Sequence, residues 1–316
     1  MKTPRYWQNK NIISTLLSPF GCVYGLATAL RIKFKKGYRA KVPVICVGNV
    51  TAGGVGKTPV AMSVAELLKS HGKKPFFVSR GFGGHLSGVL VDTKTHTAYD
   101  VGDEPLMLAS VAPTVVCPNR AEGARLAEAN GADVIIMDDG FQNPGLKKDI
   151  SFLVFNGELG IGNGQIIPAG PLRESLKSGL KRADAVIFIG EDKTGLLSKI
   201  DKPVFCADIV EQKPKHQSVS VIAFAGIGYP QKFYRSLEKC GLKPVNTYDF
   251  EDHHMYTKDE LKAILKKAKK KNLPVYTTSK DYVKIPTDMQ KNFCVLEIRA
   301  DFKQRDALWQ FMAGVF

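Results

Sequence analysis

The stretch of sequence that decides the fold runs from residue 43 to residue 58 and reads PVICVGNVTAGGVGKT. It opens with an apolar run, which is typical of a strand buried in a parallel sheet. A glycine-rich loop follows. Beyond the loop, Val60, Val64 and Leu67 recur at the spacing of one helix face, and Gly72 is suited to end that helix. The order strand, glycine loop, helix predicts a site in which backbone amides hold phosphate.

The end of this loop supplies the side chains that phosphate chemistry needs. In a P-loop a lysine reaches the β- and γ-phosphates, and a hydroxyl residue holds Mg²⁺. The strict pattern has a glycine where Thr51 stands here, but Gly53 and Gly54 still let the backbone turn toward phosphate oxygens. A purely structural glycine turn is the less favoured alternative. The predicted nucleotide-binding residues are Thr51, Ala52, Gly53, Gly54, Val55, Gly56, Lys57 and Thr58.

Outward from the P-loop, the chain continues to alternate between strand and helix patterns. Apolar runs at 75–78, 134–137, 152–155 and 185–189 predict further strands, and 120–130 predicts a helix. This alternation is typical of an α/β fold. We expect a P-loop kinase-type, mainly parallel sheet with helices on both faces.

The chain becomes polar at 211–218, where we place a domain boundary. Beyond it the alternation restarts with a strand at 219–224, a lysine-rich helix at 258–271 and a strand at 274–277. We therefore expect a second, smaller α/β domain. The expected organisation is an amino-terminal, helical, membrane-associated segment at 1–36, a P-loop kinase domain at 37–213 and the smaller domain at 214–316.

The composition is that of a globular protein, because 44% of the 316 residues are apolar and 24% are charged. The cysteines form no CxxC pair, which argues against a zinc ribbon and indicates reduced thiols. The net charge is +15, and nine basic residues but no acidic ones lie within 1–41. Such a patch attracts anionic lipid or nucleic acid. The lysines at 258–271 are read as a solvated helix face, and no nucleic-acid partner is expected.

An uncharged run at 11–30 lies inside this basic segment and has several interpretations. A transmembrane helix needs about 20 mostly apolar residues. This run contains Pro19, Gly21 and Gly25, so it is a poor candidate for a membrane span. A cleaved signal peptide fits the basic start, but a nucleotide motif follows closely, and ATP is a cytoplasmic fuel. We favour an interfacial segment that dips into the headgroup region of an anionic membrane. An ordinary core helix is the remaining alternative.

Further candidate residues end a predicted strand or lie in loops. Asp138 follows an apolar strand, where P-loop enzymes keep an acid that holds Mg²⁺, and Asp139 is a weaker candidate for the same role. Phosphoryl transfer to an alcohol also needs a group that accepts the hydroxyl proton, for which Asp103 and the pair His253 and His254 are candidates. Arginines in loop-like sequence are candidates to clamp phosphate, with ordinary surface salt bridges as the alternative: Arg80, Arg120 and Arg173.

Taken together, these pieces resemble the tetraacyldisaccharide 4′-kinases, the lipid A pathway kinases. The segment at 48–59 is similar to the extended P-loop of that family. The other matching motifs follow in order over nearly the whole chain: SRGFGG at 79–84, GDEP at 102–105, Asn119-Arg120, DDGFQ at 138–142, PAGPLRE at 168–174, Asp252-His253-His254 and TSKD at 278–281. Phe82 stands where the family more often has tyrosine.

The resemblance implies an enzyme that uses ATP and Mg²⁺ to phosphorylate the 4′-hydroxyl of a tetraacylated glucosamine disaccharide 1-phosphate. It further implies work at the cytoplasmic face of a Gram-negative inner membrane, as a peripheral or amino-terminally anchored protein. By motif, Asp103 would accept the proton, paired with His253, which we prefer to His254 because it directly follows Asp252. The other implied roles are metal binding by Thr58, Asp138 and Asp139, and lining of the site by Arg120, Arg173 and Glu174.

The main rival is a membrane-surface P-loop ATPase switch of the partitioning or septum-site kind. Those proteins carry a signature lysine at the position that Ala52 occupies here, which counts against them. A GTPase switch needs a lysine where Ser279 stands. A basic nucleic-acid-binding protein would explain the charge but not the P-loop.

Overall fold

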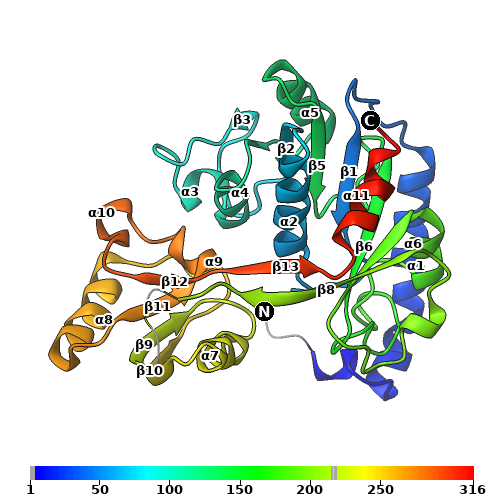
Figure 1. The fold of residues 1–316 in the computed structure, drawn as a ribbon. Helices are drawn as coiled ribbons and strands as arrows, with labels where there is room; N and C mark the ends of the chain where they lie inside the picture. Colours follow the sequence, from blue (N-terminus) through cyan, green and yellow to red (C-terminus); the bar gives the residue numbers. More distant parts are fainter. Residues whose placement is uncertain (1–3, 215, 217–218) are drawn as a thin grey trace.

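The computed structural model describes residues 4–214, 216 and 219–316. Lys2 of the basic amino-terminal segment, and Lys215, Gln217 and Ser218 of the expected domain boundary, lie outside the described residues. Within the described ranges the strands form one nine-stranded and one four-stranded sheet. The two sheets lie side by side, with helices on their faces (Figure 1).

The large sheet has the strand order β13-β8-β7-β6-β1-β5-β2-β4-β3. It is parallel except at its edges, where β13 pairs antiparallel with β8 and β3 pairs antiparallel with β4. This confirms the predicted mainly parallel α/β fold. The strands are β1 (Val44–Gly48), β2 (Pro75–Ser79), β3 (Val89–Leu90), β4 (Thr114–Val116), β5 (Val134–Asp138), β6 (Ile150–Asn156), β7 (Ala185–Ile189), β8 (Val204–Glu211) and β13 (Ile298–Phe302).

Both faces of the large sheet are covered, which explains why its central strands read as continuous apolar runs. Successive residues of β1 point to opposite faces, so Ile45 and Val47 join one core cluster while Val44 and Cys46 join the other. The first cluster packs under α2 and α11, and the second under α5 and α6. The helices of this part are α2 (Lys57–Ser70), α3 (Ala98–Val101), α4 (Asp103–Ala109), α5 (Arg120–Ala129), α6 (Leu176–Arg182) and α11 (Arg305–Ala313), with a short 3-10 turn η2 (Leu197–Lys199).

The small sheet is parallel throughout, in the order β10-β9-β11-β12. Its central strand β9 again alternates, with Val221 and Ala223 packed under α7 and Ile222 and Phe224 packed under α8. The elements are β9 (Ser220–Ala225), α7 (Pro230–Lys239), β10 (Lys243–Asp249), α8 (Lys258–Lys271), β11 (Val275–Thr278), α9 (Ser279–Tyr282), α10 (Thr287–Gln290) and β12 (Cys294–Leu296).

The end of the chain differs from the expected division at 213/214. Instead of staying with the small sheet, β13 returns to pair with β8, and α11 then packs against the large sheet. Ala300 N donates a hydrogen bond to Ser63 Oγ of α2 at 3.1 Å. Without β13, the backbone hydrogen-bonding groups along one side of β8 would be unpaired. The returning strand pairs with them and becomes the edge of the large sheet. In Figure 1, β8 and β13 run together as a ribbon between the two parts.

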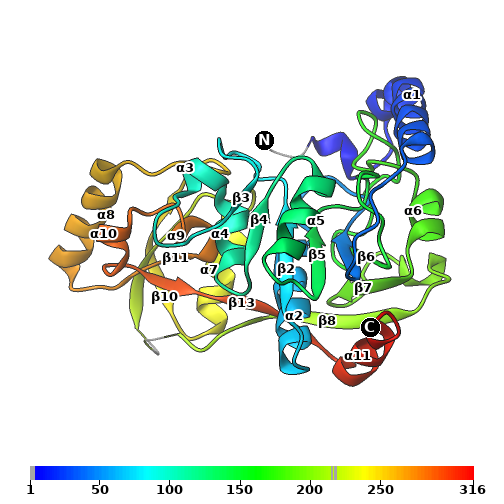
Figure 2. The same cartoon turned by 90° about the horizontal axis from the view of Figure 1, so that it is seen from above.

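The amino-terminal segment forms a short turn η1 (Arg5–Trp7) and the long helix α1 (Ile12–Phe34). Only 17% of the most apolar stretch of α1 is buried. The interpretation of this segment as an ordinary core helix is therefore wrong. The helix is long and apolar enough to cross a membrane. The residues of α1 that face the rest of the protein have small side chains or none. At Gly21 no side chain fits, because a Cβ would lie 2.7 Å from the carbonyl oxygen of Ile166. Figure 2 shows α1 at the rim of the large domain, on the side away from the small sheet.

Candidate active site

The predicted P-loop connects β1 to α2. Gly53 and Gly56 have φ values of 120° and 98°, a region that L-residues with side chains avoid. A Cβ on Gly53 or Gly54 would meet no atom within 4 Å, so this part of the loop faces open space. The loop therefore has the backbone shape and the room that phosphate groups require.

The residues after the loop meet the end of the neighbouring strand β5. Thr58 Oγ1 donates to Asp138 Oδ2 at 2.9 Å, and Lys57 Nζ lies 3.7 Å from Asp139 Oδ1. Asp138 is buried, and its Oδ1 has no hydrogen-bond partner among the residues that the structure describes. Burial, together with the charge of Glu104, raises the pKa of Asp138 to about 7. A buried carboxylate oxygen without a partner is energetically costly, so this oxygen is suited to bind a cation.

This donor set fits Mg²⁺, which usually binds one or two carboxylates and completes its shell with waters and substrate phosphates. Thr58 supplies a hydroxyl and Asp138 a carboxylate. Across the parts of the chain that the structure describes, no group of three or more His, Cys, Asp and Glu side chains is arranged as a metal cage. With only Thr58 and Asp138 as ligands, the arrangement leaves coordination positions for water and for the phosphate oxygens of a nucleotide.

Asp139 has a different set of partners from Asp138. Its backbone has a φ of 53°, and Arg173 binds its two carboxylate oxygens at 2.7 and 3.2 Å. Burial acts to raise the pKa of Asp139, but the charges of Lys57 and Arg173 outweigh it, so the pKa is lowered. Asp139 therefore stays ionised and holds Lys57 and Arg173 close to the P-loop.

The candidate proton acceptor comes from the large domain and its partner from the small one. Asp103 starts α4 and is 5% exposed, and its Oδ2 lies 2.9 Å from His253 Nδ1. His253 stands on the turn after β10 with a φ of 63°. Burial acts to raise the pKa of Asp103, but the hydrogen bond with His253 and the charge of Lys280 lower it. The same hydrogen bond raises the pKa of His253.

The structure separates the two adjacent histidines. His254 Nε2 lies 3.2 Å from Glu260 and its ring stacks on Phe250, so it faces the small domain. Asp252 lies on the same side as His253, 3.9 Å from its Nε2. The exposed ring of Phe82 stands edge-on to His253 at 5.5 Å between ring centroids. Of the two candidates, only His253 contacts Asp103.

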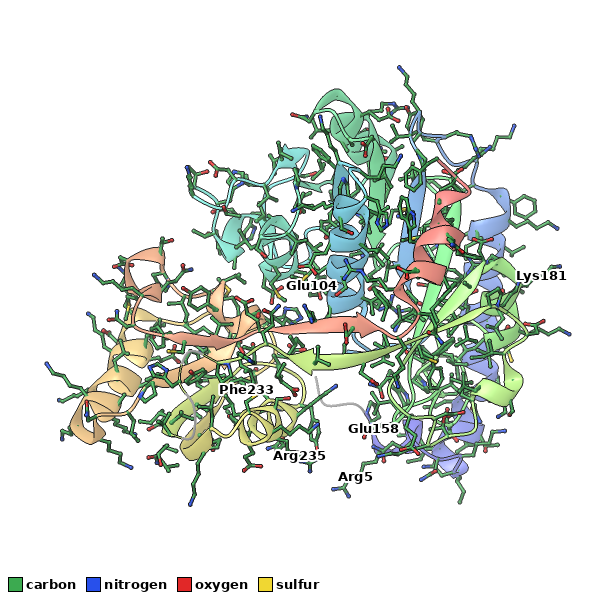
Figure 3. The ribbon with its side chains drawn as sticks, in the orientation of Figure 1. Arg5, Glu104, Glu158, Lys181, Phe233 and Arg235 are labelled. Carbon is green, nitrogen blue, oxygen red and sulfur yellow. The ribbon has the colours of Figure 1, made fainter. Side chains whose placement is uncertain are left out.

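Lys280 is a member of the site that the sequence did not single out. Its Nζ donates to Asp252 Oδ1 at 2.9 Å and to His253 Nε2 at 3.2 Å, and it lies 3.9 Å from Asp103 Oδ2. The available signal was its place in the TSKD motif directly after strand β11. Figure 3 shows Glu104, the neighbour of Asp103, near the middle of the molecule, between α2 and the small sheet.

The remaining predicted residues lie around this centre rather than against Asp103. Glu174 is buried, pairs with Arg182, and accepts a hydrogen bond from Gln142 Nε2 at 3.0 Å. Arg120 is buried at the start of α5, where Nη1 donates to Cys117 O at 2.8 Å. Neither side chain is brought into contact with His253. Glu174 thus supports the wall of the site, while Arg120 adds positive charge beside it.

Comparison with known proteins places nearly the whole chain in one family. The family model described as "Tetraacyldisaccharide-1-P 4'-kinase" matches residues 13–316. The tetraacyldisaccharide 4′-kinase of Rhodospirillum rubrum is 43% identical over 96% of this chain and 95% of its own length, and that of Parvibaculum lavamentivorans is 46% identical over 90% and 87%. A crystal structure from Aquifex aeolicus, of the same family and in complex with ATP, matches 96% of this chain and 100% of its own with a TM-score of 0.78 and 27% identity. The chain therefore belongs to the tetraacyldisaccharide 4′-kinase family.

Proposed function

We propose that this protein transfers the γ-phosphate of ATP to the 4′-hydroxyl of tetraacyldisaccharide 1-phosphate, a step of lipid A biosynthesis. The observation that carries the proposal is the hydrogen bond between Asp103 and His253, which joins the two domains beside a P-loop. Membership of the family and the likeness to a structure that holds ATP support the same conclusion.

On this proposal, Lys57 and the amides of the P-loop bind the β- and γ-phosphates of ATP. Thr58 and Asp138 would hold Mg²⁺, with Asp139 keeping Lys57 and Arg173 in position. When bound, Mg²⁺ supplies Lewis-acid stabilisation of the charge on the phosphoryl oxygens. Arg173, with Arg120 beside it, adds positive charge near the transferred group, which matters because phosphoryl transfer depends mainly on positioning and charge stabilisation.

Asp103 acts as the proton acceptor. Its lowered pKa keeps it ionised at neutral pH, so it can orient the sugar hydroxyl and take its proton as the reaction proceeds. The hydroxyl oxygen then bonds to the γ-phosphorus while the bond to the β,γ-bridging oxygen breaks, and ADP leaves. His253 Nδ1 binds the other carboxylate oxygen of Asp103. Lys280 contacts His253 Nε2 and is itself bound by Asp252, which fixes the orientation of the imidazole.

The amino-terminal helix fits a role at an anionic membrane surface, on the cytoplasmic face of the inner membrane. The apolar residues of α1 that point outward include Leu16, Phe20 and Val23, which are 64–70% exposed. Basic residues border the helix on both sides, which favours anionic lipid. With α1 in the headgroup region, acyl chains of the acceptor remain in the bilayer while its sugars reach Asp103.

The proposal is tested by ATP-dependent phosphorylation of tetraacyldisaccharide 1-phosphate in detergent, with Lys57→Ala and no-acceptor controls. We expect a phosphorylated lipid that forms only with the unaltered protein, and loss of nucleotide binding in the variant. Hydrolysis of ATP without phosphorylation of the lipid would contradict the proposal and favour the membrane ATPase switch. Unchanged nucleotide binding in Lys57→Ala would contradict the assignment of the P-loop.

A further inference from the structure

A fully buried carboxylate lies in the small domain, outside the centre described above. Asp281, in α9, is 0% exposed and pairs with Lys284, whose Nζ lies 2.7 Å from Asp281 Oδ1 and whose side chain is also buried. Replacing a buried ion pair by apolar side chains is often neutral or stabilising, so such a pair is weak evidence for a role in stability. The hydrogen bonds that Asp281 accepts point instead to a role in geometry.

The two oxygens of Asp281 accept hydrogen bonds from three separate loops. Gly226 N, after β9, donates to Oδ2 at 3.0 Å, and Tyr256 OH, beyond the turn that follows β10, donates to Oδ1 at 2.9 Å. Thr278 Oγ1, at the end of β11, donates to Oδ2 at 2.7 Å. Because these strands are parallel, their carboxyl ends lie at one edge of the small sheet. Asp281 therefore ties together the three loops at that edge.

Two of the three loops carry the side chains that contact Asp103. His253 lies on the turn between β10 and Tyr256. Lys280 directly precedes Asp281 in α9. Helix α9 also packs against α4, the helix that begins at Asp103 (Figure 1). The edge of the small sheet that Asp281 organises is thus the edge that meets the large domain.

The turn that carries His253 is fixed at both ends. His253 has a φ of 63°, which is unfavourable for a residue with a side chain and persists only where the surroundings hold it. Before the turn, Phe250 N donates to Ala225 O at 2.9 Å. After the turn, the Tyr256 ring packs on Phe250 at 5.0 Å between centroids, and its hydroxyl reaches Asp281. Asp281 therefore supplies the anchor at the far end of the turn.

The three loops pack on one another without spare room. A Cβ on Gly226 would lie 2.9 Å from the Tyr256 hydroxyl oxygen and 3.1 Å from Asp281 Oδ1. Burial and the charge of Asp281 raise the pKa of Tyr256, so its hydroxyl keeps its proton and remains a donor. A change in the hydrogen bonds of Asp281 would therefore be transmitted to the turn rather than absorbed by empty space.

We propose that Asp281 is a positioning residue that holds His253 and Lys280 in place. The inference rests on the proposed function, in which both of these side chains serve Asp103. Asp281 acts through the loops that it anchors rather than on the substrates. A misplacement of about 1 Å at a catalytic group can cost on the order of 10²-fold in rate. Loss of this anchor should therefore lower kcat and leave the P-loop unaffected.

The first test removes one hydroxyl group from the anchor. Tyr256→Phe keeps the buried ring but loses the hydrogen bond to Asp281. We expect kcat to fall about tenfold, while KM for ATP and the affinity for ATP stay near their original values. Unchanged kcat in this variant would overturn the proposal.

Tyr276→Phe is the matched control for the loss of a buried hydroxyl. Tyr276 is another buried tyrosine of the small domain, but its hydroxyl contacts His216 Nδ1 at 3.0 Å instead of Asp281. This variant should lose thermal stability to a similar extent as Tyr256→Phe and keep its kcat. An equal loss of kcat in the two variants would overturn the proposal, because any destabilisation of the domain would then have the same effect.

A second test separates positioning from a general loss of structure. Asp281→Asn keeps the shape of the side chain but replaces one accepting oxygen by an amide group that only donates. In the unaltered background we expect kcat to fall at least about tenfold. In the background His253→Gln/Lys280→Met, where the positioned groups are already gone, the same substitution should cost less than about threefold. An equal loss in both backgrounds would overturn the proposal. If Asp281→Asn does not fold, the same comparison with Tyr256→Phe decides.

A measurement without substrate distinguishes failure of this proposal from failure of the proposed function. If the unaltered protein does not phosphorylate the acceptor, the proposed function fails, and the placement of His253 is decided by NMR titration of its ring. The hydrogen bond with Asp103 raises the pKa of His253 above its ordinary value of 6.5. Tyr256→Phe should move the titration back toward that value, whereas Tyr276→Phe should leave it unchanged. Identical titrations in all three proteins would overturn the positioning role.

Discussion

The two halves of the active site are built in different ways. The nucleotide half consists of Asp138, a buried residue that ends β5, and of Lys57 and Thr58, which start α2 after the loop that follows the neighbouring strand β1. The half that faces the acceptor includes His253, whose side chain is 37% exposed and stands on a turn of the other domain. The first half is part of the large core, whereas the second exists only while the two domains are docked. Variants should therefore affect the two halves separately.

The largest effect is expected for Asp103→Asn. Loss of the proton acceptor should lower kcat about 10²–10⁴-fold, while the affinity for ATP stays close to that of the unaltered protein because the P-loop is untouched. Steady-state phosphorylation and equilibrium binding of ATP measure the two quantities. Asp301→Asn, which alters an exposed carboxylate on β13, is the control. A kcat like that of the unaltered protein would exclude Asp103 as the base.

The next effect separates the adjacent histidines. His253→Gln should lower kcat roughly 10- to 100-fold, because Asp103 loses the group that orients it. His254→Gln should change kcat by less than about threefold, since His254 contacts Glu260 and Phe250 instead. Both variants are compared under saturating ATP and acceptor. If His254→Gln were the inactive one, the pairing of His253 with Asp103 would have no catalytic meaning.

A smaller effect is expected for Lys280→Met, which removes the cation behind His253. We expect a loss of about tenfold in kcat, and recovery of part of it in Lys280→Arg. Because the charge of Lys280 helps to lower the pKa of Asp103, its removal should move the acidic limb of the pH–rate profile to higher pH. A purely structural role would lower kcat without moving that limb. Lys262→Met, on the exposed side of α8, provides the control.

The smallest effect concerns the pH dependence of stability. The pKa of His253 is raised in the folded protein, so its interaction with Asp103 stabilises the fold fully below the ordinary pKa of 6.5 and is lost as pH rises through the raised value. Since the His253 side chain is 37% exposed, the contribution is small. We expect thermal unfolding of the unaltered protein to lose a little more stability from pH 6 to pH 9 than that of His253→Gln. Parallel curves for the two proteins would contradict this linkage.

Much of the fold could be predicted because its signals are local. The strands at 134–137 and 185–189 became β5 and β7, and the helix at 120–130 became α5. The return of β13 to the large sheet could not be predicted in this way. Only one of its five residues, Ala300, is buried, and nothing within the strand specifies which edge it will cover. The choice of β8 as its partner depends on where the small domain leaves the end of the chain.

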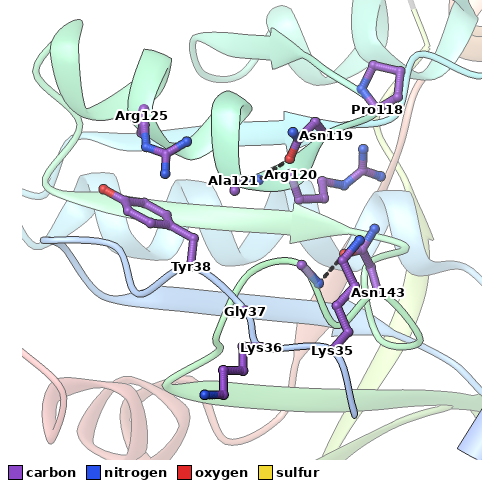
Figure 4. A pocket seen from close by; sticks show the side chains of 11 residues that line it. Lys35, Lys36, Gly37, Tyr38, Pro118, Asn119, Arg120, Ala121, Arg125 and Asn143 are labelled. Atoms are coloured by element: carbon purple, nitrogen blue, oxygen red, sulfur yellow. Dashed lines mark hydrogen bonds between the residues drawn. The ribbon is translucent and has the colours of Figure 1, made fainter. Parts of the chain in front are cut away.

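The candidate site shows the same division. The roles expected of Lys57, Thr58 and Asp138 follow from a strand, a loop and the next strand end, because parallel strands bring their carboxyl ends to one edge. The position of Lys280 required knowing how the small domain docks. The contact of the residues after α1 with the loop after β5 (Figure 4), where Tyr38 N donates to Gly145 O, also required the tertiary structure, because these segments lie more than a hundred positions apart in the chain.

By itself, the sequence determined the P-loop, the alternation of strands and helices and the basic amino-terminal segment, since each depends on residues close together in the chain. Only the tertiary structure decided which imidazole meets Asp103. The resemblance to the family motif favoured His253, but His253 and His254 are neighbours with the same chemistry, and the local sequence does not say which one contacts Asp103. The left-handed backbone at His253 and the docking of the two domains turn that ring toward Asp103 and leave His254 against Glu260.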